Sequence, residues 1–474
     1  MMSLNKILSI KHILKKAVNI LEETAPYADA AYIYRKSTDI SKDNTNIETV
    51  KEADRGIKLR VFDGEKFIEE GFSDISEGNI IKKANFLRWK IKKKRKTSKT
   101  SIDEKIFFPQ KEKITKHFSN KPDINPDKIS IKQKIEFVKK LQKKVSKPKY
   151  IINARIRYDE NYETKIFVNR NKSLSQNISG CHLAILPFIQ SEIGDMRYHY
   201  SSFFKPGYEV TKLNQKDIKE AINTAKKMIK AKKIKPGKYT CILSPHVSGI
   251  LAHESFGHGM EADTIMKDRA KAKEYIGKRI AKTSVSIVDD PSFPDRHGSF
   301  FFDDEGIITK PTYLIKKGIV GNPISDLYST RQLAKNLKIQ RSGNARAESY
   351  DHKVYSRMSN TYFLEGKHKL KSMQKKVKDG MFLHNSGGGM EDPKGWGVQI
   401  QGVTAERIKN GRLTGEFFYE IGITGYLPNI LGNIAAVSDK LEVPGTGHCG
   451  KGHKEWVKVS EGGPHLLIKN LNLS

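Results

Sequence analysis

Apolar residues recur at helical spacing between residues 4 and 21, with lysines among them. This pattern predicts an amphipathic helix that packs on a hydrophobic core, and a transit or membrane-surface helix is the alternative. A strand pattern follows at 30–35. A second strand pattern at 56–62 continues through a turn at 63–64 into 66–71, which is a hairpin signal.

The composition then changes before a second set of regular patterns begins. Residues 78–92 fit a helix, whereas 93–130 are rich in lysine and contain Pro109, Pro122 and Pro126, which indicates a linker or an exposed insertion. A middle unit combines helices with strands and ends at Pro236-Gly237. Its predicted elements are a helix at 131–145, strands at 151–158, 164–169 and 173–188, and a helix at 215–233.

The last part begins with a buried-strand pattern at 238–243, followed by a helix at 247–258. Beyond residue 300 the pattern is largely that of strands separated by glycine turns. We therefore predict an α+β fold, with N-terminal α/β parts followed by a β-rich C-terminal domain that carries the helix at 247–258. The expected domains are 1–115, 116–236, which a basic linker precedes, and 237–474.

Composition narrows the class of protein. Hydrophobic residues make up 37% of the 474 residues, which is a low share, but their regular spacing favours a folded chain over a disordered one. No apolar run approaches the roughly 20 residues that span a bilayer, and no signal-peptide pattern is present. We therefore expect a cytoplasmic protein with no membrane partner.

The net charge of +33 raises nucleic acid as an alternative partner. Many lysines lie in runs, for example at 92–96 and 226–233, and not in a zinc-finger, helix-turn-helix or aromatic RNA-binding motif. A lysine-rich proteome or acidic partners explain the charge equally well. Nucleic-acid binding therefore rests on charge alone.

The predicted helix at 247–258 places Glu254 between His253 and His258. Imidazole nitrogens bind zinc, and a carboxylate beside a zinc site is the usual general base of metallopeptidases. Five residues turn an α-helix by about 500°, so the two histidines would point roughly 140° apart. If both are to hold one ion, the helix needs a π-bulge or an unwound last turn, which Gly257 makes easier.

Two histidines and a glutamate on a helix are more often ordinary surface or core residues than metal ligands. Here the preceding residues Val247, Ile250, Leu251 and Ala252 are apolar, so the helix is expected to be buried. Unpaired polar groups are costly in such a place, and a metal ion supplies a partner for them. This context favours a metal site.

Catalytic zinc sites usually take three protein ligands, and Cys449 in a glycine-rich loop is our candidate for the third. His448 and His453 from the same region are rivals, and a free buried thiol is the alternative for Cys449. Three cysteines far apart do not make a disulfide framework. Cys181 and Cys241 lie in apolar strand patterns and are predicted to be core residues.

Five ordered blocks cover nearly all of the last part, and a looser match, GIKLRVFDGEKFIEEGF, stands at 56–72. Together they resemble the TldD/PmbA family of metallopeptidases, also described as modulators of DNA gyrase. The blocks are LAHESFGHGMEADTI (251–265), SIVDDPSF…GSFFFDDEG (286–306), SGNARAESYDHKVYSRMSNTYF (342–363), GGGMEDPKGWGVQIQG (387–402) and GTGHCGKG…VSEGGPHLLIKNL (445–471).

The family has two paralogous types, and only the TldD type keeps the zinc motif. This chain keeps His253, Glu254 and His258, so it resembles the catalytic TldD type, and the resemblance makes Cys449 the third zinc ligand. His448, directly before the cysteine, departs from the family pattern. The resemblance implies substrates that are unfolded or unstructured peptides, held as an added strand in a channel inside a dimer. The second chain would be identical or a paralogue that lacks the motif.

The predicted reaction is hydrolysis of a peptide bond by metal-activated water, with Zn²⁺ as cofactor and Glu254 as general base. Arg357 and Asn360 are candidates to bind the substrate, although surface salt bridges are their more common role. Glu261 and Asp263 are candidates to orient a ligand histidine, and solvated carboxylates at a helix end are the alternative.

Two other classes of function stay open. One is a non-enzymatic basic partner protein of nucleic-acid machinery that has a structural metal site. The other is a metal-dependent hydrolase of a small amide.

Overall fold

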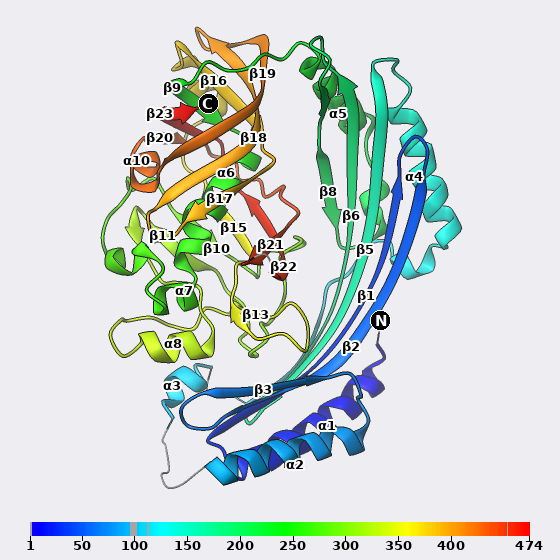
Figure 1. Ribbon diagram of the computed structural model, residues 1–474, viewed down its shortest axis with the longest axis vertical. Coiled ribbons are helices and arrows are strands. Elements are labelled where there is room, and N and C mark those ends of the chain that lie inside the picture. The colour runs from blue at the N-terminus through cyan, green and yellow to red at the C-terminus, as the bar shows by residue number, and fades with distance from the viewer. Residues whose placement is uncertain (1, 95–101, 111–112, 453) are drawn as a thin grey trace.

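The computed structural model describes residues 2–94, 102–110, 113–452 and 454–474, and three large sheets organise them (Figure 1). One sheet of eight strands uses the N-terminal and middle strands, and sheets of six and seven strands build the C-terminal part. The predicted α+β fold with a β-rich C-terminal part is confirmed. None of the described helices combines the length and the apolar character that crossing a bilayer requires.

The eight-stranded sheet has the order β3-β2-β1-β5-β6-β4, with β7 and β8 paired to β6. The predicted hairpin is confirmed as β2 and β3. The strands predicted at 151–158 and 164–169 are one strand, β5, because β1 and β6 pair with it through the polar residues between them. The strands are β1 (Tyr27–Lys42), β2 (Ile47–Phe62), β3 (Phe67–Phe72), β4 (Ile114–Ser119), β5 (Ile151–Asn169), β6 (Lys172–Gln190), β7 (Met196–Tyr198) and β8 (Ser201–Lys205).

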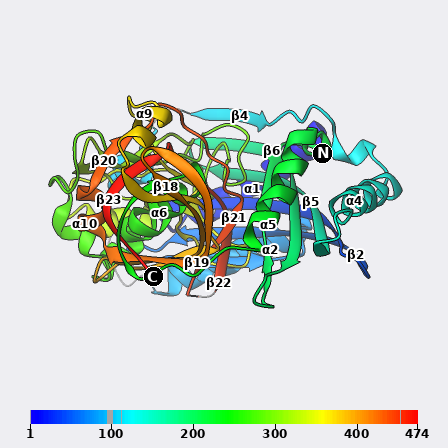
Figure 2. The ribbon, with the colours of Figure 1, turned by 90° about the horizontal axis from the view of Figure 1, so that it is seen from above.

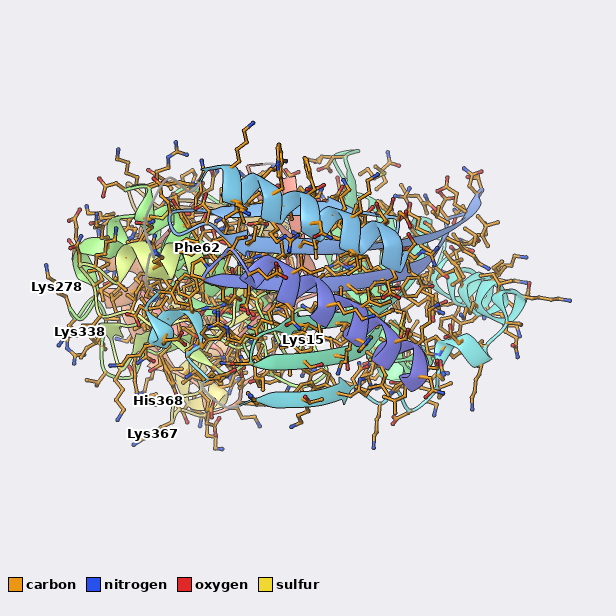
Figure 3. All side chains as sticks on the ribbon, turned by 90° about the horizontal axis from the view of Figure 1, so that it is seen from below. Lys15, Phe62, Lys278, Lys338, Lys367 and His368 are labelled. Atoms are coloured by element: carbon orange, nitrogen blue, oxygen red, sulfur yellow. The ribbon has the colours of Figure 1, made fainter. Side chains whose placement is uncertain are left out.

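Four helices cover one face of this sheet. Tyr32 and Ile166 pack with the helices α1 and α2, and Ile40 and Tyr158 pack with α4 and α5. All four side chains come from even-numbered positions of β1 and β5, which point to one face of a pleated sheet. Figure 3 shows α1 and α2 side by side on that face. The helices are α1 (Leu4–Glu22), α2 (Glu77–Lys94), α4 (Ile131–Val145) and α5 (Gln215–Met228), close to the predicted ranges.

The opposite face of the sheet meets the C-terminal part. Phe167 packs with Phe302, and the ammonium of Lys165 lies 2.6 Å from the carboxylate of Asp304. Arg60 of β2 forms a buried ion pair of 2.7 Å with Glu305. These contacts set the position of the C-terminal part against the sheet.

Of the two alternatives predicted for 93–130, a linker or an exposed insertion, the linker is wrong for part of that stretch. It contains a short helix, α3 (Glu104–Phe107), and β4, which pairs in parallel with β6; residues 95–101 and 111–112 lie outside the described residues. Lysines hide this strand in the sequence. Its Phe118 stacks on Phe301 at 5.2 Å, which supplies the apolar contact that the composition did not suggest. The domain division at residue 115 stays a prediction.

The C-terminal part combines two sheets. The six-stranded sheet has the order β12-β11-β10-β15-β22-β21, and the seven-stranded sheet has the order β16-β9-β23-β19-β18-β17, with β20 beside β23. The strands are β9 (Gly237–Leu243), β10 (Ile287–Asp289), β11 (Thr312–Lys316), β12 (Ile319–Val320), β15 (Asn360–Phe363), β16 (Asp379–Asn385), β17 (Gly388–Asp392), β18 (Gly397–Lys409), β19 (Arg412–Tyr426), β20 (Ile434–Val437), β21 (Gly447–Lys451), β22 (Lys454–Gly462) and β23 (Leu466–Leu473).

The buried helix α6 (Pro245–Ala252) lies at the centre of the C-terminal core. It packs against β15 and β22 of one sheet and β16 of the other, and Figure 2 shows β18 and β19 curving around it. Its Val247 and Leu251 are fully enclosed. The remaining α-helices and strands of the C-terminal part are α7 (Ala262–Met266), α8 (Leu327–Leu333), α9 (Leu370–Lys375), α10 (Leu427–Gly432) and the two-stranded pair of β13 (Ala345–Arg346) and β14 (Tyr355–Ser356).

Candidate metal centre

The backbone changes its helical type where the histidines lie. Ser244 caps α6 by accepting a hydrogen bond from the backbone amide of Val247. After the α-helix ends at Ala252, residues His253–Gly257 form a π-helical turn and His258–Met260 a 3₁₀ turn. Residues five apart align on a π-helix, so the distortion that the histidine spacing requires is confirmed.

Glycine lets this turn lie close to its neighbours. A Cβ atom on Gly257 would lie 1.9 Å from the Sδ atom of Met358, so any side chain there collides with a buried methionine. On the preceding helix, a Cβ atom on Gly249 would lie 2.2 Å from the backbone nitrogen of Gly462. The helix is therefore packed directly against β22 and against the loop that carries Met358.

The turn brings three donor side chains together. One nitrogen each of His253 and His258 and the Sγ atom of Cys449 lie within 4.8 Å of one another. The Sγ atom is 3.3 Å from Nε2 of His258, and the two imidazole rings stand nearly perpendicular with their centroids 5.2 Å apart. The Nδ1 atom of His253 is buried and has no hydrogen-bond partner among the described residues.

This donor set fits a zinc ion. Zinc in proteins is bound by imidazole nitrogen and cysteine sulfur, and three such ligands with an open position are typical of catalytic sites. Burying a polar nitrogen without a partner is costly, and an ion held by the three side chains accounts for their close approach. Sequence reasoning proposed the same three residues, and their role as ligands stays a prediction.

The three side chains change each other's protonation. Burial raises the pKa of the Cys449 thiol, but the neighbouring imidazoles of His258 and His253 outweigh burial and bring that pKa well below its usual range. Burial lowers the pKa of His258, but Cys449 and Glu261 together hold it well above its usual range. Because the thiolate is the form that binds metals, this setting favours the ligand state of Cys449.

Cys449 lies on β21, which forms a hairpin with β22. It faces Val457 across the hairpin. The guanidinium of Arg357 donates a hydrogen bond of 2.7 Å to the carbonyl oxygen of Cys449, and a second one to the carbonyl oxygen of Glu455. Arg357 therefore ties both strands of the hairpin to the loop before β15.

Glu261 connects the histidine to this arginine. Its carboxylate lies 3.4 Å from Nδ1 of His258 and 3.3 Å from Nε of Arg357. Lys451 lies 3.1 Å from Glu261 and 2.6 Å from Asp263, so the carboxylates are neutralised by a shared ammonium. Burial raises the pKa of Glu261, but Lys451 and His258 outweigh it and keep that pKa low. The expectation that Glu261 orients a ligand histidine agrees with these distances.

Besides Glu261, three carboxyl groups lie around the π turn, those of Glu254, Glu391 and Glu461, and sequence reasoning found only Glu254 of these three. Glu391 accepts a hydrogen bond of 3.1 Å from the backbone amide of Gly259, and burial holds its pKa well above the usual value. Burial also raises the pKa of Glu461 to about 7. The missing side chain of Gly389 leaves room for Glu254, since a Cβ atom there would lie 2.6 Å from its Cγ. Glu391 lies on β17 and Glu461 on β22, and these strands, distant in the sequence, approach the π turn only in the folded chain.

The two predicted substrate-binding residues have internal partners. Arg357 is 1% exposed and binds the carbonyl groups and Glu261 as described. Asn360 is fully buried and donates hydrogen bonds to the carbonyl oxygen of Asp290 and to the hydroxyl of Ser299. The surface salt bridges expected as their more common role are therefore wrong, and substrate binding by either stays a prediction.

The remaining candidate residues are the two histidines near Cys449 and the two other cysteines. His448 lies next to Cys449 on β21, but its ring packs edge-on against His297 at 5.1 Å and takes no part in the donor group. His453 lies outside the described residues. Cys181 and Cys241 are buried free thiols in β6 and β9, as predicted.

Sequence comparison adds relatives to this geometry. The profile of the PmbA/TldA metallopeptidase C-terminal domain matches residues 236–474. A protein named metalloprotease from Methanocaldococcus jannaschii is 29% identical over 95% of this chain and 97% of its own length. A zinc metalloprotease TldD homolog from Saccharolobus solfataricus is 29% identical over 67% of this chain and 70% of its own length.

Solved structures share the whole fold. A Thermotoga maritima protein described as a candidate modulator of a DNA gyrase matches with a TM-score of 0.77 at 16% identity, over 98% of this chain and 100% of that one. TldE from Thermococcus kodakarensis matches with a TM-score of 0.67 at 13% identity, over 98% of this chain and 100% of its own. The fold is therefore common to several distant proteins.

Proposed function

The chain belongs to the PmbA/TldA metallopeptidase family, and on this premise we propose that it is a zinc-dependent peptidase that hydrolyses unfolded or unstructured peptides. The observation that carries the proposal is the π turn, which presents His253 and His258 to Cys449 and holds Glu254 between them. Two imidazoles and one thiol favour zinc, and the name of the Saccharolobus solfataricus relative specifies zinc.

In this proposal His253, His258 and Cys449 hold the ion. Bound zinc supplies Lewis-acid polarisation and makes water more acidic. Glu254 accepts the proton of the attacking water and returns it to the leaving amine, as a general base and then a general acid. Glu261 orients the ring of His258 through its Nδ1 atom.

The remaining expectations become proposals on the same premise. Residues 237–474 form the catalytic domain and follow the N-terminal parts 1–115 and 116–236. The protein works as a dimer, with an identical chain or with a paralogue that lacks the zinc motif. The match to TldE supports a partner of the same fold. We place the protein in the cytoplasm.

An assay with a disordered protein as substrate tests the proposal. The zinc-loaded protein should cleave it, a chelator should stop cleavage, and Glu254→Gln should abolish cleavage while zinc stays bound. Glu220→Gln, an exposed glutamate on α5, is the matched control and should keep full activity. Full activity of a folded Glu254→Gln protein contradicts the mechanism. Salt-dependent DNA binding without chelator-sensitive cleavage would favour the non-enzymatic alternative, and cleavage of dipeptides alone would favour the small-amide hydrolase.

A further inference from the structure

A cavity of about 680 Å³ lies between the N-terminal sheet and the hairpin of β21 and β22. Figure 1 shows this hairpin on the side of the C-terminal part that faces the sheet. Arg35 and Lys165 line the cavity from the sheet, and His448 and Lys458 line it from the hairpin. None of the three candidate metal ligands lines it, so the cavity is a separate feature of the molecule.

The pairing of the hairpin separates the cavity from the metal centre. His448 pairs with Lys458, and Cys449 pairs with Val457 on the next position. Since successive side chains on a strand point to opposite faces, Cys449 faces the π turn while His448 and Lys458 face the cavity. The same two strands therefore carry a candidate metal ligand on one face, and the ammonium of Lys458 and the ring of His448 on the other.

Three cations that line the cavity, Arg296, Arg346 and Lys458, form no ion pair with a carboxylate among the described residues. Arg35 is neutralised by Glu163 at 2.8 Å, and Lys165 is neutralised by Asp304 at 2.6 Å. The ammonium of Lys458 has no carboxylate within 4 Å among the described residues. The guanidinium of Arg346 donates hydrogen bonds to two backbone carbonyl groups and lies over the ring of Phe300 at 5.0 Å.

The cavity also has unsatisfied and apolar groups. The Nε2 atom of His297 is buried without a hydrogen-bond partner, and its ring packs against Phe204 at 5.4 Å. Phe300 and Trp456 add aromatic surface. Removing an unpaired cation from water is costly. A bound anion with an apolar portion would pair with the cations and would also pack against the aromatic rings.

We propose that this cavity binds a carboxylate of an acidic peptide, with the ammonium of Lys458 as its principal contact. The inference rests on the proposed peptidase function, and it names acidic peptides as the preferred substrate class. Because β21 is the outer strand of its sheet, a peptide that passes its free edge can present neighbouring residues to both faces of the hairpin.

A carboxylate fits the lining of this cavity better than a phosphate. Glu163, Asp304 and four further carboxylates line the cavity, and their charges disfavour a bound dianion more than a monoanion. The aromatic rings also suit the aliphatic part of a glutamate or aspartate residue. Inorganic phosphate is therefore the competitor against which the proposal is tested.

The test measures peptide binding without cleavage. The zinc-loaded Glu254→Gln protein is titrated with a fluorescent peptide that contains glutamates and with its glutamine counterpart, at an ionic strength of about 0.15 M, where exposed charges are screened. We expect the acidic peptide to bind about tenfold more tightly, as one charge-assisted hydrogen bond allows. Lys458→Met should remove the difference and Lys458→Arg should keep it. Lys367→Met, at an exposed lysine labelled in Figure 3, is the control.

The outcomes separate this inference from the proposed function. An unchanged preference in Lys458→Met overturns the carboxylate site, even where the native protein cleaves peptides. A preference that depends on Lys458, in a protein that cleaves nothing, supports the site and contradicts the proposed function. Competition by inorganic phosphate at lower concentration than by acetate would assign the cavity to phosphate and overturn the inference.

Discussion

The guanidinium of Arg357 donates a hydrogen bond of 2.7 Å to the backbone carbonyl of Cys449. The arginine also forms an ion pair with Glu261, whose carboxylate lies 3.4 Å from Nδ1 of His258. A buried side chain without contact to the proposed ion thus positions two of its three proposed ligands. The structure therefore predicts that metal affinity depends on residues outside the donor group.

Arg357→Met should weaken zinc binding without removing a ligand. We expect an affinity about tenfold lower or more, as is usual when a group that orients a ligand is lost. Competition with a chelator of known zinc affinity measures the change. Arg412→Met, at an exposed arginine of β19, is the control and should bind zinc like the native protein. Equal affinity for both variants would show that Arg357 has no positioning role.

Gly257→Ala should disturb the π turn. The added methyl would overlap the Sδ atom of Met358, and overpacking of this kind costs roughly 1–3 kcal/mol of unfolding free energy. We expect a lower Tm and a loss of zinc, because His258 follows directly. Gly432→Ala, where the structure leaves open space, should change neither. A Gly257→Ala protein with native Tm and native zinc content would contradict the account of this turn.

Glu305 should be essential for joining the two halves of the molecule. It lies 2.7 Å from both Arg60 and Arg341, and all three side chains are buried. Glu305→Ala leaves the buried guanidinium of Arg341 without its ion-pair partner and leaves Arg60 with Asp29 alone, and breaking a buried pair in this way costs about 3–5 kcal/mol. Urea unfolding measures the loss, and Glu220→Ala is the exposed control. A loss below about 1 kcal/mol would mean that the pair contributes little.

His199 should make the protein sensitive to acid. Burial lowers its pKa to about 4 in the folded protein, whereas an unfolded histidine titrates near 6.5. The neutral folded form therefore contributes stability that is fully present above pH 6.5 and is lost as the pH falls towards 4. Between pH 7 and pH 5 we expect a loss of about 2 kcal/mol that His199→Gln reduces. Parallel Tm profiles of the native and variant proteins would rule this out.

The sequence predicted what depends on local pattern. Helical spacing located α1 and α4, and the five-residue separation of His253 and His258 predicted a π-bulge or an unwound turn, of which the structure has the π turn. It could not predict β4, because lysines dominate that stretch and the strand depends on its pairing with β6. Glu391 and Glu461 were missed for the same reason, since they reach the site only when distant strands are assembled.

Arg357 is a residue whose burial could not be predicted from the sequence. A lone arginine in a loop is ordinarily exposed, and nothing nearby in the sequence marks it as buried. Its partners Glu261 and Cys449 are about a hundred residues away on either side, and burial follows only from their convergence. Sequence patterns therefore identified the donor residues better than the residues that hold them in place.

Zinc analysis of purified variants tests the central claim most directly. The native protein should bind one zinc ion per chain, and Cys449→Ser should lose most of it. Cys241→Ser, which changes another buried thiol, should retain it in full. If Cys449→Ser remains folded and keeps its zinc, the ion is not held by His253, His258 and Cys449, and the account is wrong.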